Sequence, residues 1–280
     1  MILVRTRDAL AGAMSTLRAS GATALVPTMG FLHEGHLSLV DRARELADRA
    51  VVSIFVNPLQ FGPAEDLATY PRDEARDLSL LEARGADLVF VPAIEEMYPS
   101  GEPAVTVSPG RLEDRLCGRY RPGHFSGVLT VVAKLFGLVR PDVAVFGRKD
   151  FQQAVLIRRM VQDLNLGVRV ETGPIVREPD GLAMSSRNAY LSDGERAQAV
   201  GLSRALLLAL GRFHEGESGA TALLEAVKDE LARFPLLRLQ YAELVDPEGL
   251  DSVDPAESGS VLALAAFCGT TRLIDNVELS

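Results

Sequence analysis

The chain has 280 residues, a length that fits one large domain and one smaller domain. With 47% hydrophobic and 24% charged residues it has the composition of an ordinary soluble globular protein. Its net charge of −9 argues against non-specific nucleic-acid binding, which needs a basic surface.

Cysteines and apolar runs indicate the compartment. Cys117 and Cys268 are the only cysteines, so no disulfide framework is expected and a reducing environment fits. Arg5, Arg7 and Asp8 stand where a signal peptide needs an unbroken apolar stretch, and every apolar run is too short to span a bilayer. We therefore expect a cytoplasmic protein with no membrane and no nucleic-acid partner.

The first part of the chain alternates short apolar runs with stretches of helical periodicity. The expected strands cover residues 22–27, 50–56, 87–92, 142–146 and 167–170. The expected helices cover residues 37–49, 74–84, 128–139 and 151–164. Strands that alternate with helices of this length are typical of βαβ units, so we expect an α/β fold with a mainly parallel sheet.

The pattern changes after Pro174. Residues 174–188 contain two prolines and no clear period, which indicates a loop or linker. Ser192 and Glu195 match a capping box that opens a helix reaching about residue 213. A second helix is expected over residues 219–234, and strands over residues 239–245, 260–266 and 271–277. This order predicts a small α+β domain.

Residues 33–36 read His-Glu-Gly-His, which first suggests a metal site. The well-attested zinc motif His-Glu-x-x-His puts its histidines one turn apart inside a helix. Here the histidines are three residues apart, Gly35 is a poor residue for a helix interior, and no third Cys or His ligand is near in sequence. The spacing disfavours a metal site.

An anion site is the second interpretation of the same residues. The expected strand at 22–27 ends before Thr28-Met29-Gly30, and the next helix begins near Gly35. In open α/β sheets ligands lie beyond the carboxyl ends of the strands, where helix N-termini favour phosphate. The alternative is a turn in which His33 and His36 cap the helix or contact solvent. This stretch alone does not decide between the two.

Polar residues also follow other expected strands. Asn57 and Gln60 offer neutral amides for a carboxylate or hydroxyl group, or else form a turn around Pro58. Lys149 precedes a helix, where the helix dipole disfavours a cation, so a phosphate contact gains weight over a solvated lysine. His124, in "RPGHFSGV", is interpreted as structural rather than catalytic.

The segment "AMSSRN" offers hydroxyls and an arginine within the expected linker. A mobile loop of this composition suits closure over phosphates, although an ordinary serine-rich connector has the same composition.

Several segments together resemble the pantoate–β-alanine ligase (pantothenate synthetase) family. They are "PTMGFLHEGH", "FVNPLQF", "YPRD", "RPGHFSGVLTVVAKLF", "FGRKDFQQ" and "PIVREPDGLAMSSRNAYL", in the expected order over residues 27–191. The resemblance implies a nucleotidylyltransferase-like Rossmann sheet, with HxGH and MSSR segments similar to the HIGH and KMSKS motifs of class I aminoacyl-tRNA synthetases. It divides the chain into a Rossmann-like domain, residues 1–176, and a smaller α+β domain, residues 177–280, which begins with the MSSR loop.

The resemblance also implies a two-step reaction. Pantoate attacks the α-phosphate of ATP to give pantoyl adenylate and pyrophosphate, and the amine of β-alanine then displaces AMP. Mg²⁺ is expected on the nucleotide phosphates, and a homodimer is implied. Competing hypotheses are a nucleotidylyltransferase that stops at a nucleotide-linked product and, disfavoured by the acidic charge, a nucleic-acid-binding module.

Site residues follow from the matched segments. His36, the family's proton donor, His33, Lys149 and Arg187 match catalytic positions, where they would stabilise phosphate charge. The implied ATP-binding residues are Met29, Gly30, His33, Gly35, His36, Gly147, Arg148, Lys149, Asp150, Val176, Met184, Ser185, Ser186 and Arg187. Gln60, Gln153 and Asn57 are implied for pantoate, and Gln60 for β-alanine as well.

Two positions depart from the family pattern. Arg148 stands where an acid or amide is expected, which adds a cation beside the nucleotide. Asp77 fits an acidic position that could help to hold Mg²⁺, but Arg76 replaces a neighbouring acid and puts a protein ligand for the metal in doubt.

Overall fold

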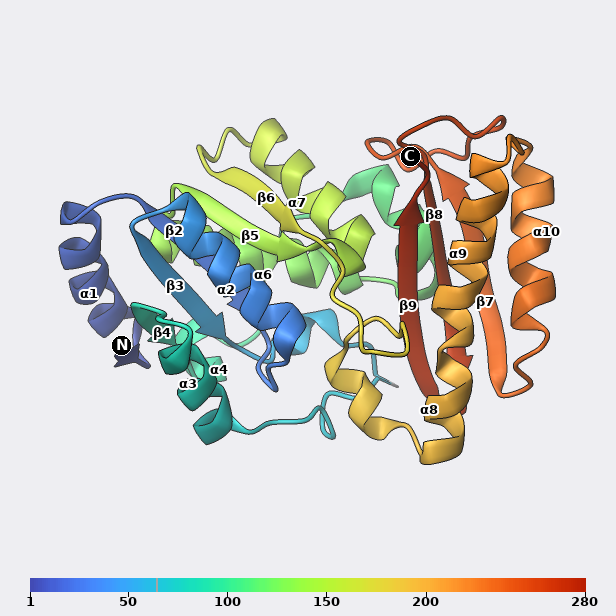
Figure 1. Ribbon diagram of the computed structural model, residues 1–280. Helices are drawn as coiled ribbons and strands as arrows, with labels where there is room; N and C mark the ends of the chain where they lie inside the picture. The colour runs from blue at the N-terminus through green and yellow to red at the C-terminus, as the bar shows by residue number, and fades with distance from the viewer. Residues whose placement is uncertain (64) are drawn as a thin grey trace. The chain divides into compact units, whose positions relative to one another are not determined.

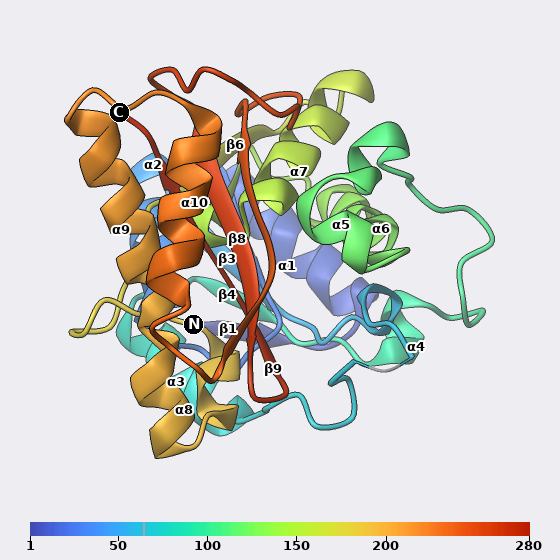
Figure 2. The same ribbon diagram turned by 90° about the vertical axis from the view of Figure 1, so that its right-hand side faces the viewer.

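The computed structural model describes residues 1–63 and 65–280, which form two compact units (Figures 1 and 2). The first unit comprises Met1–Gly110, Arg121–Arg148 and Leu156–Pro174. The second unit comprises Arg111–Tyr120, Lys149–Val155 and Ile175–Ser280. The single boundary expected after residue 176 stays a prediction.

The first unit is built on a six-stranded sheet with the order β1-β4-β3-β2-β5-β6. All of its strand pairs are parallel. The strands are β1 (Ile2–Val4), β2 (Thr23–Thr28), β3 (Arg49–Ile54), β4 (Leu88–Phe90), β5 (Val143–Gly147) and β6 (Arg169–Gly173). The predicted α/β class is confirmed, and five of these strands overlap the predicted ones. The sixth, β1, is a three-residue edge strand that the sequence pattern missed.

Helices cover the sheet on both faces. They include α1 (Arg7–Ala19), α2 (Glu34–Leu46), α3 (Glu74–Ala83) and α6 (His124–Val139), and the short α4 (Ile94–Met97) precedes α6. Because βαβ crossovers are right-handed, α2 and α3, which lead toward the β1 edge, cover one face, and α1 and α6, which lead the opposite way, cover the other. Buried side chains of α2 pack on alternate residues of β2, β3 and β5, such as Val26, Val52 and Val145.

The strand order changes direction between β2 and β5, which are parallel, hydrogen-bonded neighbours: β3 lies on one side of this pair and β6 on the other. The connection after β2 leads through α2 to β3, whereas the connection after β5 leads through α7 (Phe151–Asp163) to β6. In open α/β sheets such a reversal marks the usual place of ligands, beyond the carboxyl ends of the two strands.

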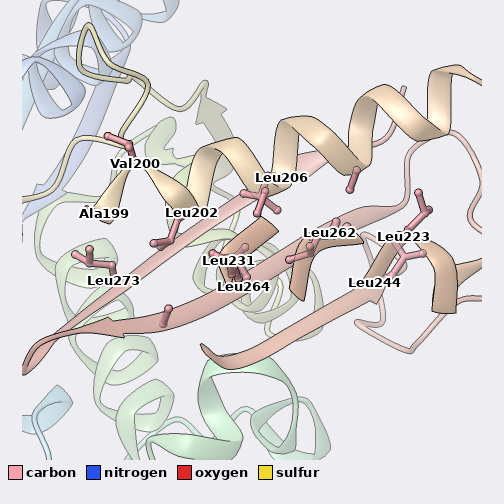
Figure 3. Packing of buried hydrophobic residues seen from close by; sticks show 14 of the residues in the cluster. Ala199, Val200, Leu202, Leu206, Leu223, Leu231, Leu244, Leu262, Leu264 and Leu273 are labelled. Atoms are coloured by element: carbon pink, nitrogen blue, oxygen red, sulfur yellow. The ribbon is translucent and has the colours of Figure 1, made fainter. Parts of the chain in front are cut away.

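The second unit has an antiparallel sheet, β7 (Leu237–Val245), β8 (Val261–Cys268) and β9 (Thr271–Glu278), in the order β7-β8-β9. Its helices are α5 (Leu116–Tyr120), α8 (Asp193–Ala199), α9 (Gly201–His214) and α10 (Ala220–Leu231). Figure 2 shows α9 and α10 side by side over the strands, and Figure 3 shows the leucine-rich core beneath them, to which Leu206, Leu223 and Leu264 contribute.

The single helix predicted from Ser192 to residue 213 is wrong in one respect. The capping box of Ser192 and Glu195 is present, but the helix breaks at Val200 into α8 and α9. A Cβ on Gly201 would lie 2.6 Å from Cδ2 of Phe234, so the absent side chain lets that ring pack against the backbone. Tertiary packing at the junction overrides the continuous apolar pattern.

Gly127 of α6 allows the backbone of another segment to approach the helix. A Cβ at this position would lie 2.2 Å from the carbonyl oxygen of Leu59 and 2.7 Å from the amide nitrogen of Gln60. Both atoms belong to the 3-10 helix η1 (Pro58–Gln60), which is joined to the end of β3 by a short loop. Because these are backbone atoms, η1 itself must shift to make room for a side chain.

Gly127→Ala is therefore expected to lower the free energy of unfolding by about 1–3 kcal/mol, the usual cost of overpacking. Gly137→Ala in the same helix is the matched control, because nothing lies within 4 Å of its Cβ position. The control should gain roughly 0.5–1 kcal/mol, since alanine is the better helix former. Urea unfolding of both variants measures the difference, and equal stabilities would contradict the close approach of η1.

Candidate active site

The turn between β2 and α2 is built around one buried carboxylate. Gly30 and Phe31 have φ angles of 82° and 50°, and the amides of Phe31 and Leu32 each donate to a different oxygen of Asp77 at 2.7 Å. A Cβ on Gly30 would lie 2.9 Å from Ile54 Cγ2 and 3.0 Å from Asp77 Oδ2. Glycine is thus required there both by the left-handed backbone and by the close carboxylate.

Arg76 holds the same turn from its exposed side. Its Nη1 donates to the carbonyl of Leu32 at 2.9 Å, and its guanidinium lies over the ring of Phe31. Burial raises the pKa of Asp77 above its ordinary value, although the two backbone amides and the Arg76 charge act in the opposite direction.

These contacts bear on the expected Mg²⁺ ligand. The side chain of Asp77 is 1% exposed, and both of its oxygens accept backbone hydrogen bonds. Among residues 1–63 and 65–280, no group of three or more His, Cys, Asp or Glu side chains could hold a metal ion. The role of Asp77 in metal binding stays a prediction, and the geometry gives this carboxylate a different set of partners.

His33 and His36 cap the helix that follows the turn. Nδ1 of His33 accepts from the amide of Gly35 at 3.2 Å, and Nδ1 of His36 accepts from the amide of His33 at 3.4 Å. An accepting Nδ1 carries no proton, so each neutral ring carries its proton on Nε2. The two interpretations of this segment are therefore compatible, because a ring that caps through Nδ1 offers an Nε2–H donor to an anion.

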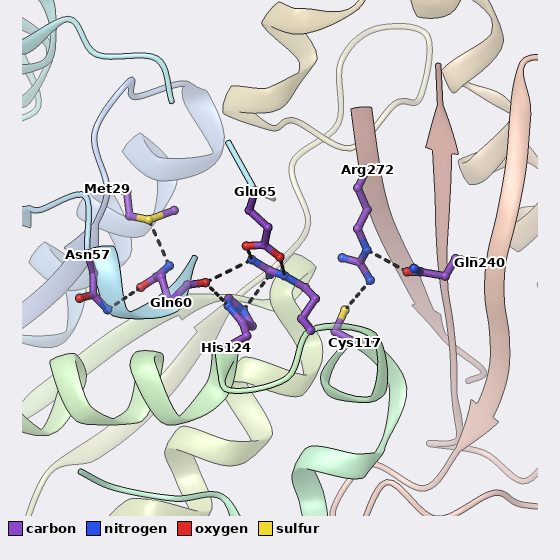
Figure 4. Close-up of polar contacts among 9 residues, drawn as sticks. Met29, Asn57, Gln60, Glu65, Cys117, His124, Gln240 and Arg272 are labelled. Atoms are coloured by element: carbon purple, nitrogen blue, oxygen red, sulfur yellow. Dashed lines mark hydrogen bonds and ion pairs between the residues drawn. The ribbon is translucent and has the colours of Figure 1, made fainter. Parts of the chain in front are cut away.

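A chain of amide groups follows β3, and each member fixes the next (Figure 4). Oδ1 of Asn57 accepts from the amide of Leu59 at 3.3 Å, and its Nδ2 donates to the carbonyl of Gly127 at 3.1 Å. A backbone amide can only donate and a carbonyl can only accept, so the orientation of the Asn57 amide is determined. Tyr98, whose pKa burial raises, adds a hydroxyl donor to Oδ1 at 2.8 Å.

The orientation of Gln60 follows from that of Asn57. Nδ2 of Asn57 donates to Oε1 of Gln60 at 3.1 Å, which leaves Nε2 of Gln60 as the donor end, 3.1 Å from the sulfur of Met29. Three predicted site residues, Met29, Asn57 and Gln60, are thus joined beyond the ends of β2 and β3. Asn57 itself is 1% exposed and has protein partners on both ends of its amide.

Gly147 and Arg148 stand at the carboxyl end of β5 and are both half-buried. Burial and the charge of nearby Arg158 lower the pKa of Arg148. Arg148, the cation that departs from the family pattern, therefore lies at the carboxyl end of β5, the strand next to β2. Its contact with a nucleotide stays a prediction.

The second unit organises the predicted ATP-binding residues Val176 and 184–187 around a hairpin. The amide of Met184 donates to the carbonyl of Val176 at 3.0 Å, and Arg177 pairs with Ala183 in an antiparallel bridge. Ser185 caps the 3-10 helix η4 (Ser186–Tyr190) by accepting from the amide of Arg187. The segment expected to be a linker is therefore partly ordered by backbone pairing.

Two adjacent residues of β9 hold this hairpin and the Lys149 segment. Asp275 is 1% exposed and accepts from Nη1 and Nη2 of Arg177 at 2.6 and 3.0 Å. Nδ2 of Asn276 donates to the carbonyl of Lys149 at 3.0 Å. Burial raises the pKa of Asp275 despite the opposing effects of Arg177 and Lys149. Sequence reasoning missed both residues, although polar side chains inside the apolar run "RLIDNVEL" were a signal.

Two predicted residues are not connected to the others. Asp150, in the 3-10 turn before α7, is exposed, and Gln153 is half-buried in the first turn of that helix. In the described part of the chain, neither side chain forms a hydrogen bond with another predicted site residue.

Comparison with known proteins identifies the family. The sequence profile of the family described as pantoate-beta-alanine ligase matches residues 2–278. The chain belongs to the pantoate–β-alanine ligase family.

Relatives of known sequence support this assignment over the whole length. The pantothenate synthetase of Thermoanaerobacter sp. (strain X514) is 53% identical over 253 residues, which cover 90% of this chain and 89% of that protein. The pantothenate synthetase of Pseudothermotoga lettingae is 50% identical over 279 residues, covering 100% of this chain and 99% of that protein.

Solved structures agree. Pantothenate synthetase from Thermus thermophilus has a TM-score of 0.94 at 46% identity and covers 100% of this chain and 99% of its own. The pantoate-beta-alanine ligase of Francisella tularensis, in complex with beta-gamma ATP and β-alanine, has a TM-score of 0.83 at 31% identity, with 100% and 98% coverage. The predicted family and the nucleotidylyltransferase-like fold of a pantoate–β-alanine ligase are thereby confirmed.

Asp77 supplies the first test of the site of this ligase. Asp77→Ala leaves the amides of Phe31 and Leu32 without their acceptor in a buried turn, which should lower the free energy of unfolding by about 2–5 kcal/mol. The matched control is Asp73→Ala, which removes one exposed N-cap bond to Arg76 and should cost about 1 kcal/mol. Equal losses in urea unfolding would show that the turn does not depend on Asp77.

Proposed function

We propose that this chain condenses pantoate with β-alanine at the expense of ATP and releases pantothenate, AMP and pyrophosphate. The observation that carries the proposal is the family match over residues 2–278. The ligands named for the Francisella tularensis relative, an ATP form and β-alanine, support the same substrate class. The fixed donors at the ends of β2 and β3 add a physical basis.

The reaction has two steps. A carboxylate oxygen of pantoate attacks the α-phosphorus of ATP, and the bond to the bridging oxygen of pyrophosphate breaks. The amine nitrogen of β-alanine then attacks the carbonyl carbon of the pantoyl adenylate, loses a proton, and AMP leaves with the former carboxylate oxygen. The first step crowds negative charge around the α-phosphate, so donors that are already oriented are what the chain must supply.

The proposed roles follow this charge. His36 and His33 donate from Nε2 to phosphate oxygens, which is where capping through Nδ1 puts the ring proton. Gln60 donates from Nε2 to pantoate and contacts β-alanine, and Asn57 belongs to the pantoate site through its bond to Gln60. Gln153 is a second pantoate contact, and Lys149 and Arg187 neutralise phosphate charge.

The remaining ATP-binding proposals rest on the same family segments. They concern the backbone and side chains of Met29, Gly30, Gly35, Gly147, Arg148, Asp150, Val176, Met184, Ser185 and Ser186. We also propose that Mg²⁺ enters on the ATP phosphates, where it offsets charge during displacement. The buried Asp77 carboxylate does not fit a direct ligand, so no protein ligand is assigned to the ion.

We further propose a homodimer located in the cytoplasm, as the family resemblance implies. The described residues contain no helix that is long and apolar enough to cross a membrane.

A product assay tests the reaction. With ATP, Mg²⁺, pantoate and β-alanine, the protein should form pantothenate, AMP and pyrophosphate in equal amounts, measured by chromatography. With β-alanine omitted, pantoate should still promote exchange of labelled pyrophosphate into ATP. ADP and phosphate as products would exclude an adenylate, and exchange without any pantothenate formation would favour a nucleotidylyltransferase.

Substitutions test the charge-stabilising residues. His36→Asn keeps an acceptor where Nδ1 caps the helix and removes the Nε2 donor, so kcat for adenylate formation should fall by roughly 10²-fold while the fold survives. Lys149→Ala should lower the same rate by a similar factor. His214→Ala and Lys228→Ala, both exposed on other helices, are matched controls expected to keep the wild-type rate.

The readout is the pyrophosphate exchange rate, with circular dichroism to verify folding. Exchange rates near wild type in His36→Asn and Lys149→Ala would refute the proposed roles of these two residues, but they would not contradict the proposed reaction.

A further inference from the structure

A histidine outside the proposed catalytic set is held by an ion pair. Arg121 donates to Glu65 from Nε at 2.7 Å and from Nη2 at 2.6 Å, a two-bond geometry that fixes the guanidinium plane (Figure 4). Burial would raise the pKa of Glu65, but the bonds and the charge of Arg121 hold it below its usual value. The pair is therefore ionised at neutral pH, and its side chains are only 12% and 25% exposed.

The fixed guanidinium determines the protonation of His124. Nη1 of Arg121 lies 2.9 Å from Nε2 of His124, and Nδ1 of His124 lies 2.8 Å from the carbonyl oxygen of Gln60. A guanidinium only donates, so Nε2 must accept and carries no proton. A carbonyl only accepts, so Nδ1 must donate. Both contacts are satisfied only by the neutral ring with its proton on Nδ1.

The same contacts immobilise the main chain of Gln60. Its carbonyl oxygen faces Nδ1 of His124 and also accepts from Nη2 of Arg121 at 3.4 Å. The side-chain amide at the other end of the residue is oriented by Asn57. Gln60 is thus fixed at its backbone by one set of contacts and at its side chain by another.

We propose that His124 is a positioning residue, which in its Nδ1–H form holds the carbonyl of Gln60 and so places the Gln60 amide for pantoate. The Glu65–Arg121 pair selects that form of the ring. The inference rests on the proposed role of Gln60 in pantoate binding. His124 is not a proton-transfer group, because its only lone pair on the ring nitrogens, at Nε2, faces a permanent cation.

Two isosteric substitutions separate the contacts of the ring. In His124→Asn the Nδ2 group takes the place of Nδ1 and still donates to the Gln60 carbonyl. In His124→Gln the terminal amide takes the place of Nε2. It therefore faces Arg121, and the Gln60 carbonyl loses the donor that Nδ1 of His124 supplies. His124→Ala removes both contacts.

The expected result is a split among these variants. The KM for pantoate should rise roughly 10-fold in His124→Ala and His124→Gln, because the Gln60 amide is then no longer held in position to bind pantoate. In His124→Asn, which keeps the donor to the Gln60 carbonyl, the KM for pantoate should rise about 2-fold or less. The KM for ATP should change by less than about 2-fold in all three. Steady-state kinetics of pantothenate formation measures the split, and thermal unfolding verifies that the variants are folded.

Two outcomes overturn the proposal. Equal pantoate KM values in all three variants and the wild type would show that His124 does not position Gln60. Equal increases in His124→Asn and His124→Gln would show that the ring only fills space.

A second readout does not depend on activity. The ¹⁵N shifts of the His124 ring, assigned by comparison with His124→Asn, should show a protonated Nδ1 and an unprotonated Nε2 near neutral pH. The opposite tautomer or a doubly protonated ring would refute the inference. Failure of the wild type to form pantothenate would refute the proposed function instead and leave this measurement interpretable.

Discussion

The hydrogen bonds from the amides of Phe31 and Leu32 to the Asp77 carboxylate hold the turn from which the proposed site is built. After β2 the chain adopts two successive left-handed residues, Gly30 and Phe31, before α2 begins. Such a backbone is costly for Phe31, and its amide points inward, away from water. The carboxylate accepts that amide and the next one, and Arg76 holds the carbonyl of Leu32. Only with the turn fixed does α2 start at a residue where His33 and His36 can cap it.

The second unit uses a similar arrangement. Asp275, buried in β9, binds the guanidinium of Arg177, which also donates to the carbonyl of Gly181 inside the hairpin. An ionised carboxylate at such a position is costly by itself, and the two-bond pair with a guanidinium compensates for part of that cost. The neighbouring Asn276 bonds the carbonyl of Lys149. Two segments that lie far apart in the sequence are therefore bound to one strand, one through an arginine side chain and the other through a backbone carbonyl.

Much of this could be predicted from sequence, and the exceptions have physical causes. The parallel sheet followed from apolar runs alternating with amphipathic stretches, and the same pattern placed the His-Glu-Gly-His segment between a strand end and a helix start. The edge strand β1 is too short to show a period, and the packing of Phe234 against Gly201 at the helix break is a long-range contact that no local pattern reveals. The Phe31 amide that Asp77 accepts, the Gln60 carbonyl that His124 contacts and the Arg177 that pairs with Asp275 lie 46, 64 and 98 residues away in sequence, so spacing could not assign them.

The polar groups around the proposed substrates share one property. His33, His36, Asn57 and His124 each use one polar atom on a backbone group, whose sense as donor or acceptor cannot change; for Asn57 this atom is Oδ1, which accepts from the amide of Leu59. The sense of the other polar atom is then fixed as well: a donor for the capping histidines, a donor toward Gln60 for Asn57, and an acceptor for His124. Donors oriented before the substrate arrives need no reorganisation when charge develops on the α-phosphate, and that is where preoriented dipoles differ most from water. If the substrates bind as proposed, a chain with a net charge of −9 stabilises a polyanionic transition state locally, because the sense of the dipoles beside the phosphates matters more than the overall charge.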